Sequence, residues 1–145
     1  MRSRYLYFED VELGDDIGPV TKIVNDEQVV EFVALRDPNP NPSRFTSEEA
    51  AKAEGLPGAI VPGAMNIALM SQILTGWSPS ICMKKIDVGF RQMVPHNQPL
   101  LLSGIITDKD ESGDTTDLEC DIVMENSEGV KLVIGHAQFA LPNKP

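Results

Sequence analysis

The stretch "PGAMNIALMSQILTGW", residues 62–77, decides the fold. Its apolar side chains lie nearly all around a helical projection, which is typical of a helix buried in a core and not of one lying on a surface. We expect Gly76 to end this helix. Met65, Met70 and Trp77 suit either a plain core or the lining of a tunnel. The segment therefore predicts a buried central helix that the remaining elements must cover.

Downstream of this helix the chain contains only strand and turn patterns. The predicted strands cover 84–94, 99–109, 115–125 and 130–141, with turns at Ser112-Gly113-Asp114 and Ser127-Glu128-Gly129. In 115–125, apolar residues alternate with acidic ones, as in a half-buried antiparallel strand.

Upstream, a strand at 18–24 precedes the helices. The pattern predicts an α+β protein with one domain over 1–145. We expect a curved antiparallel sheet of about five strands to wrap the helix. Its edge strands and one flank of the helix would still need cover, which a dimer would provide.

A rigid polar elbow, "DPNPNPSRFT", residues 37–46, joins the end of one predicted helix to the start of the next. Asn25 and Gln28 form a capping box for the helix "DEQVVEFVALR", in which Val29, Val30, Phe32 and Val33 share a broad apolar face. Pro38 predicts that this helix stops at Asp37. Thr46 with Glu49 reads as a second capping box, for a short helix that closes at Gly55.

The amino-acid composition disfavours some classes of function. The 145 residues include 41% hydrophobic and 23% charged residues, as in ordinary globular proteins, and carry a net charge of -10. Such a charge disfavours binding to the phosphate backbone of nucleic acids. An anionic ligand would need a local basic cluster, for which the candidates are Arg36, Arg44, Lys84, Lys85 and Arg91.

Cysteine and histidine usage and hydropathy add further expectations. Cys82 and Cys120 form no CxxC pair, and with two histidines in the chain no zinc site of the usual spacing is expected. The first residues, "MRSRYLYFED", lack the apolar region of a signal peptide. The longest apolar segment, 59–74, is too short and polar to cross a bilayer. We therefore expect a soluble, cytoplasmic protein with no membrane partner.

Five segments together resemble the MaoC-like hydratase and dehydratase family of hotdog-fold proteins. They are "YFEDVELGDDI", "FVALRDPNP", "AAKAEGLPGAIVPGAMNIALM", "IDVGFRQMVPHNQPL" and "GHAQFALP", in the family's order and over nearly the whole chain. The resemblance implies the hotdog fold. It also implies reversible hydration of a 2-enoyl thioester to a 3-hydroxyacyl thioester on coenzyme A (CoA) or an acyl carrier protein, with no cofactor beyond that carrier. The expected partners are a second copy or another hotdog chain.

The family's Asp-x-Asn-Pro-x-His motif is incomplete in this chain. Aligned on the first Asn-Pro, Asp37 and Asn39 match and Pro42 replaces the histidine; aligned on the second, Arg44 replaces it and Asn39 takes the acid position. Neither replacement can move a proton at physiological pH. His96, in a loop we expect to be exposed, and His136, in the last strand, do not match the catalytic position.

The remaining candidate residues lie on the central helix. The resemblance gives Gly63 the role of a backbone donor to the enolate oxygen, beside the catalytic candidates Asp37 and Asn39. Arg44, Asn66 and Ser71 are candidates for substrate binding. For Gly63, Asn66 and Ser71, tight packing or an ordinary hydrogen bond in the core is an equally open interpretation.

Three functions follow from this pattern. The first is a hydratase or dehydratase that uses Asp37. The second is a non-catalytic hotdog subunit that completes a heteromer, because the histidine is missing. The third is a module that binds acyl-CoA. A thioesterase is disfavoured, because the helix from Gly63 to Trp77 contains no Asp or Glu.

Overall fold

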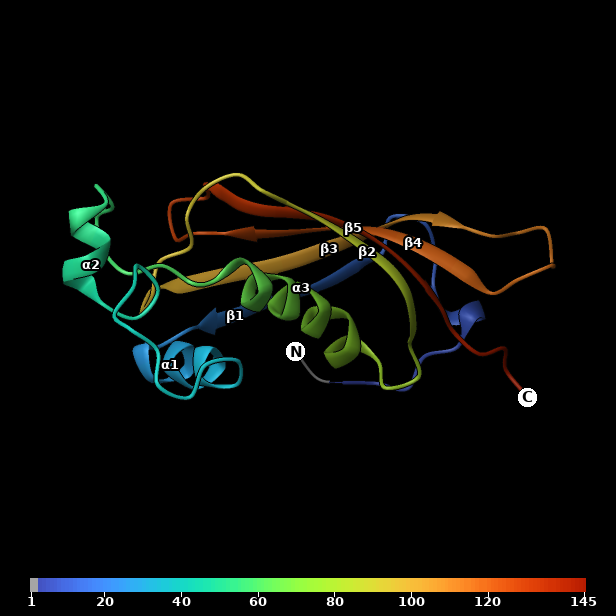
Figure 1. Ribbon diagram of the computed structural model, residues 1–145. Helices are drawn as coiled ribbons and strands as arrows, with labels where there is room; N and C mark the ends of the chain where they lie inside the picture. The colour runs from blue at the N-terminus through green and yellow to red at the C-terminus, as the bar shows by residue number, and fades with distance from the viewer. Residues whose placement is uncertain (1–2) are drawn as a thin grey trace.

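A curved five-stranded antiparallel sheet wraps one long helix, α3, in the computed structural model, which describes residues 3–145 (Figure 1). The strands are β1 (Asp16–Ile23), β2 (Cys82–Phe90), β3 (Pro99–Lys109), β4 (Asp117–Glu125) and β5 (Lys131–Ala140). Their order across the sheet is β1-β3-β4-β5-β2, so β1 and β2 form its edges. The α+β architecture predicted from the sequence is confirmed.

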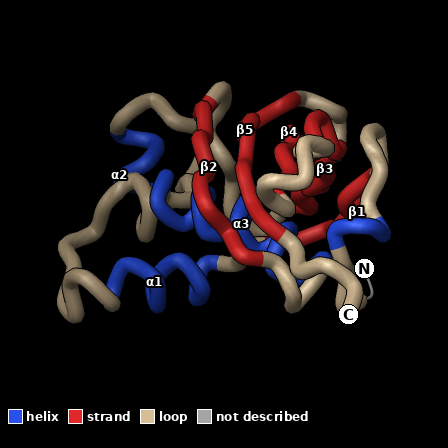
Figure 2. Tube along the Cα trace, turned by 90° about the vertical axis from the view of Figure 1, so that its right-hand side faces the viewer, coloured by secondary structure: helices blue, strands red, loops and turns tan. Residues whose placement is uncertain are grey.

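Helix α3 (Gly63–Trp77) packs against the concave face of the sheet, in contact with β1, β2, β3 and β4. Figure 2 shows the strands curving around it. Met70 and Leu74 are fully buried, and Met65 and Trp77 pack against the same core. The helix continues through Gly76, which is a correction to the predicted end. It is also less enclosed than expected, because Ala64, Ile67, Ala68, Gln72, Thr75 and Gly76 are exposed.

The inner face of the sheet has two glycines that make room for Ile122. Gly104 and Gly135 pair with Ile122 from the two neighbouring strands. A Cβ atom at Gly104 would lie 2.8 Å from Ile122 Cγ2, and one at Gly135 would lie 3.0 Å from Ile122 Cγ1. The Ile122 side chain therefore spreads over both glycine positions, inside the core that the sheet forms with α3.

Two short helices lie beyond one end of the sheet (Figure 1). In α1 (Asp26–Ala34) the capping box of Asn25 and Gln28 is confirmed, although Val29 is the only residue of this helix that is buried. In α2 (Glu48–Ala53) the capping residue is Ser47, which accepts from the Ala50 N–H, and not Thr46 as predicted. The Thr46 hydroxyl instead accepts from Ser43 N–H within the elbow. No helix in the described chain is long and apolar enough to cross a membrane.

Candidate functional site

The start of α3 presents backbone donors that have no partner among the described residues. Pro62 occupies the N-cap position and supplies no side-chain cap, and the first intrahelical bond runs from Asn66 N to Pro62 O at 3.1 Å. The N–H groups of Gly63, Ala64 and Met65 therefore have no acceptor inside the helix. They also lie at the positive end of the helix dipole. This tip is suited to hold a negatively charged oxygen.

Phe90, the last residue of the edge strand β2, covers one side of this tip. A Cβ atom at Gly63 would come within 3.3 Å of Phe90 Cζ, so the residue at 63 must be small or the ring must move. The Phe90 ring is itself 52% exposed. Close packing, one of the two roles that the sequence suggested for Gly63, therefore applies. Its N–H still lies at the tip of α3, where the other role would need it.

Asn66 is the buried polar residue next to the tip. Only 3% of its surface is exposed. Its Nδ2 donates weakly to Val61 O at 3.5 Å, and its Oδ1 has no hydrogen-bond partner in the described chain. Leaving a buried acceptor unpaired costs roughly 1–3 kcal/mol, so such groups are rare without a functional reason.

The structure brings only part of the elbow close to α3. The Arg44 carbonyl accepts from Ile60 N–H at 3.0 Å, three residues before Gly63. The Arg44 guanidinium lies 5.2 Å from the centre of the Phe45 ring and 3.8 Å from Glu54 Oε2, which fixes it toward α2. These contacts place the second half of the elbow beside the segment that leads into α3.

The first half of the elbow continues from α1. Asp37 and Asn39 are exposed, and Asp37 Oδ1 accepts from Asn39 N–H at 3.2 Å, which closes a local turn. Ser71 lies on α3 but about 140° around the helix from Asn66 at 100° per residue, and it is half-buried. Asn66 and Ser71 therefore do not share a face of α3.

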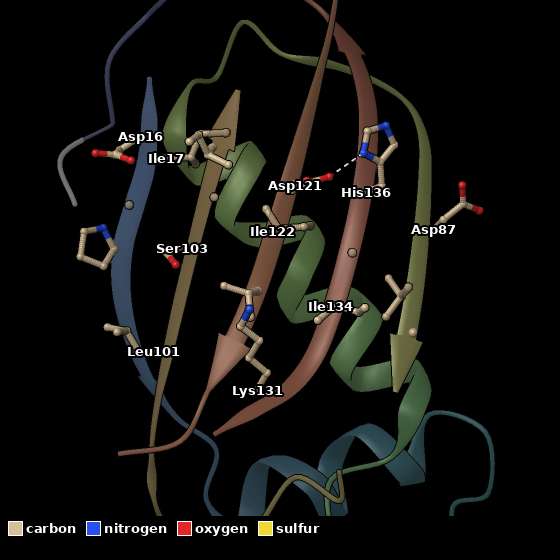
Figure 3. Close-up of a pocket in the computed structure, with 18 residues that line it drawn as sticks. Asp16, Ile17, Asp87, Leu101, Ser103, Asp121, Ile122, Lys131, Ile134 and His136 are labelled. Atoms are coloured by element: carbon tan, nitrogen blue, oxygen red, sulfur yellow. Dashed lines mark hydrogen bonds and ion pairs between the residues drawn. The ribbon is translucent and has the colours of Figure 1, made fainter. Parts of the chain in front are cut away.

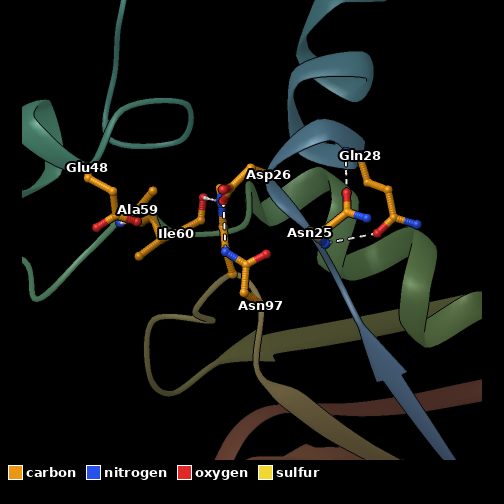
Figure 4. A network of polar contacts seen from close by, with 8 residues as sticks. Asn25, Asp26, Gln28, Glu48, Ala59, Ile60 and Asn97 are labelled. Carbon is orange, nitrogen blue, oxygen red and sulfur yellow. Dashed lines mark hydrogen bonds and ion pairs between the residues drawn. The ribbon is translucent and has the colours of Figure 1, made fainter.

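His96, which sequence reasoning placed in an exposed loop, is buried. Figure 4 shows Asp26, Ile60 and Asn97 in the surrounding network of polar contacts. The His96 Nδ1 lies 2.9 Å from Asp26 Oδ1, and its Nε2 lies 3.0 Å from Ile60 O. Both partners are acceptors, so a neutral ring can donate to only one of them. The hydrogen bonds that Asp26 accepts from His96 and then from Asn97 lower the pKa of its carboxyl.

These contacts attach the loop between β2 and β3 to the segment that leads into α3, and we call this set of contacts the clasp. Besides the His96 contacts, Val61 N–H donates to Val94 O at 2.8 Å and Asn97 N–H donates to Val24 O at 2.7 Å. The clasp joins the start of α1 to residues 60 and 61, directly before the α3 tip. No local sequence signal revealed it, because its partners lie 36 and 70 residues away from His96.

The other titratable candidates lie elsewhere. His136 is held between Asp121 Oδ1 (2.8 Å) and Glu119 Oε1 (3.2 Å) on the outer face of the sheet, and these hydrogen bonds raise its pKa. Burial raises the pKa of the Cys120 thiol to about 12, so it is unreactive. Among residues 3–145, no group of three or more His, Cys, Asp and Glu side chains could hold a metal ion.

No protein-family model and no curated protein sequence matches this chain. Several solved structures share its fold. The R-hydratase PhaJ1 from Pseudomonas aeruginosa superposes with a TM-score of 0.82 at 16% identity, over 97% of this chain and 88% of that one. The MaoC-like dehydratase from Rhodospirillum rubrum gives 0.80 at 18% identity, over 97% and 99%. The ChsH1-ChsH2 complex from Mycobacterium tuberculosis gives 0.77 at 17% identity, over 90% and 98%. These likenesses establish the hotdog fold predicted from the sequence.

Proposed function

We propose that the protein is a MaoC-like hydratase or dehydratase. It would interconvert a 2-enoyl thioester and a 3-hydroxyacyl thioester carried on CoA or on an acyl carrier protein. Hotdog-fold structures similar to it over nearly their whole length include an R-hydratase and a MaoC-like dehydratase. The order of the five sequence segments supports the same family. No cofactor is needed, because the carrier comes with the substrate.

The uncapped tip of α3 is the observation that carries this proposal. Addition of water to C3 moves the C2=C3 electron pair toward the thioester and places negative charge on its oxygen. Preorganised N–H donors at that oxygen lower the barrier of such reactions. In this chain the donors are the free amides of the first turn, led by Gly63 N–H. The dipole of the 15-residue helix adds to them.

Asn66 and Asp37 have complementary roles in the proposed reaction. The unpaired Oδ1 of Asn66 accepts a hydrogen bond from the substrate. The Asp37 carboxylate takes a proton from the water that attacks C3, and the same proton is then delivered to C2. Asn39 maintains the turn that positions Asp37. Arg44 and Ser71 contact the carrier and the acyl chain.

The absent histidine sets the expected rate. A positioned acid-base group is worth roughly 10²–10⁴-fold, so Asp37 alone should support slow turnover.

The direct test is turnover of a panel of 2-enoyl-CoA substrates, followed by loss of the enoyl absorbance. We expect Asp37→Asn to lower kcat/KM at least tenfold, because the carboxylate is the only proton acceptor assigned to the reaction. Asp114→Asn, the same change in a turn between β3 and β4, should leave the rate unchanged. No turnover of any chain length, or equal rates in both variants, contradicts the proposal.

A non-catalytic subunit is the second candidate, and the missing histidine favours it. The ChsH1-ChsH2 structure shows this fold within a heteromeric complex. Here the chain would be inert alone and would support activity only when co-expressed with a hotdog chain that carries the full motif. A module that binds acyl-CoA would instead bind a CoA ester in calorimetry without any turnover. Activity of the isolated chain excludes both alternatives.

In both candidate functions, part of the protein surface stays available for contact with another hotdog chain. The edge strand β2 has free backbone groups on one side, and exposed residues of α3 such as Ile67 and Ala68 leave one flank of the helix uncovered. Pairing at this edge would satisfy the backbone and bury the flank. We propose a dimer with a second copy or with another hotdog chain through this surface.

A further inference from the structure

The outer face of the sheet, opposite α3, carries a groove that the proposed reaction does not use. The groove has a volume of about 970 Å³ and lies across all five strands (Figure 3). Its floor consists of Leu101, Ile105, Val123 and Ile134. We refer to it as the outer-face groove.

The floor is apolar although it adds nothing to the core. On β4 the inward residues Cys120, Ile122 and Met124 are buried, and Val123 points to the opposite face. Leu101 and Ile105 are 38% and 43% exposed. Apolar side chains that gather in one groove on an outer sheet face are typical of an interaction surface.

One end of the groove is acidic. Asp16, Ile105, Asp121, His136 and Asp87 form one row of paired residues across the sheet. Asp121 also bonds His136, and Lys85 Nζ lies 3.4 Å from Asp87. Asp16 carries a third carboxylate in this row. At the other end Lys131 lies opposite Glu125 in the register of β4 and β5. Carboxylates outnumber cations along the groove.

The negative charge of the groove indicates which kind of partner can bind there. A second copy is disfavoured by net charge, because the chain carries 22 acidic residues against 12 basic ones. The helix α1 contains no basic residue and α2 contains one, Lys52, so neither offers a basic face. An anionic carrier would be repelled. The groove is also too open to enclose a small ligand, which usually loses most of its surface to a pocket.

We propose that the outer-face groove docks a basic amphipathic helix of a partner protein. The apolar side of the helix rests on Leu101, Ile105, Val123 and Ile134, and Lys or Arg residues at one end pair with Asp16, Asp87 and Asp121. The floor from Leu101 to Ile105 spans about 14 Å at 3.4 Å per residue, which matches roughly nine residues of helix. This surface is independent of the proposed hydratase activity.

The test uses two labelled 18-residue peptides, an amphipathic Leu/Lys helix and its Leu/Glu counterpart, with fluorescence anisotropy as the readout. We expect the Leu/Lys peptide to bind and the Leu/Glu peptide not to bind. Ile105→Gln with Val123→Thr should weaken binding at least tenfold through the floor. Asp87→Asn with Asp121→Asn should do so through the acidic row.

Asp114→Asn with Glu128→Gln is the matched control, because it removes the same charge from two turns away from the groove. It should retain binding, and the unfolding transitions of all variants should confirm that they fold. Equal weakening in the control and the Asp87/Asp121 variant indicates attraction by net charge alone and overturns the proposal. Absence of binding to wild type overturns it too. So does sedimentation in which Ile105→Gln with Val123→Thr dissociates a wild-type dimer, because the groove would then face a second copy.

Discussion

At the residue scale, Asn66 is better explained by chemistry than by stability. Its side chain is buried, one weak hydrogen bond reaches Val61, and its Oδ1 has no partner in the described residues. Ser78 is equally buried and its hydroxyl is fully used, since it accepts from Leu6 N–H at 3.0 Å and bonds the Ser80 hydroxyl at 2.6 Å. Only Ser78 has the bonding expected of a structural polar group.

We therefore expect Asn66→Ala to leave the free energy of unfolding within about 1 kcal/mol of wild type, since little bonding is lost and alanine favours the helix. Ser78→Ala should cost about 1–3 kcal/mol, because Leu6 N–H loses its 3.0 Å partner and keeps only the longer bond to Ser80 Oγ at 3.3 Å, while the Ser80 hydroxyl loses its bond to Ser78. Urea denaturation measures both. A loss above about 2 kcal/mol in Asn66→Ala would show that Asn66 has a structural role.

Asp26 should make the free energy of unfolding depend on pH, in a direction that follows from its shifted pKa. Hydrogen bonds from His96 and Asn97 lower the pKa of Asp26 below its usual 3.8. A lowered carboxyl pKa stabilises the fold above pH 3.8, and that contribution is lost as the pH falls through the lower folded value. Asp26→Asn should therefore be less stable than wild type at pH 7 by a difference that shrinks toward pH 2. A difference that stays constant over this range contradicts the assignment.

At the scale of elements, local patterns predicted what local interactions determine. The strand predicted at 99–109 is β3 residue for residue, and Asn25 with Gln28 caps α1, because alternation and capping act within a few residues. The clasp of His96 and the Phe90 ring over Gly63 depend on distant contacts, and no local pattern contains them. Of the candidate site, the sequence therefore indicated the elbow and the α3 tip. How they are held together was visible only in the structure.

Gly104 and Gly76 test the packing between the sheet and α3. We expect Gly104→Ala to destabilise the protein by about 1–3 kcal/mol, because its Cβ would lie 2.8 Å from Ile122 Cγ2 and 3.0 Å from Asp121 O. Gly76→Ala should stabilise it by about 0.5–1 kcal/mol, since nothing lies within 4 Å of a Cβ there and alanine favours the helix. Thermal unfolding should show opposite shifts; an unchanged or higher melting temperature in Gly104→Ala would mean that Ile122 moves aside, and a lower one in Gly76→Ala would contradict the open space at that position.

At the scale of the whole molecule, one sheet separates two surfaces with different tasks. The concave side holds α3 and the candidate thioester site at its tip, and the outer side carries the acidic groove. The exposed flank of α3 lies on neither of these surfaces, and the edge strand β2 has one side without a neighbouring strand, although its Asp87 also lines the groove. The substrate, the second hotdog chain and the basic partner proposed above would therefore contact largely different parts of the fold.

The pairing surface predicts a specific loss of assembly. We expect wild type to sediment as a dimer and Ile67→Lys to sediment as a monomer, because the substitution places a charge on the α3 flank that the partner would bury. Val30→Lys, a comparable change at an exposed valine of α1, should remain dimeric. Dissociation by Val30→Lys alone would move the interface to α1.

The central claim is that the tip of α3 receives the thioester oxygen. The most direct measurement is the backbone amide NMR spectrum during titration with a 3-hydroxyacyl-CoA. We expect the amide signals of Gly63, Ala64 and Met65 to shift with ligand, as new hydrogen bonds form at the helix tip. Shifts confined to other regions, with residues 63–66 unmoved at saturation, would contradict it.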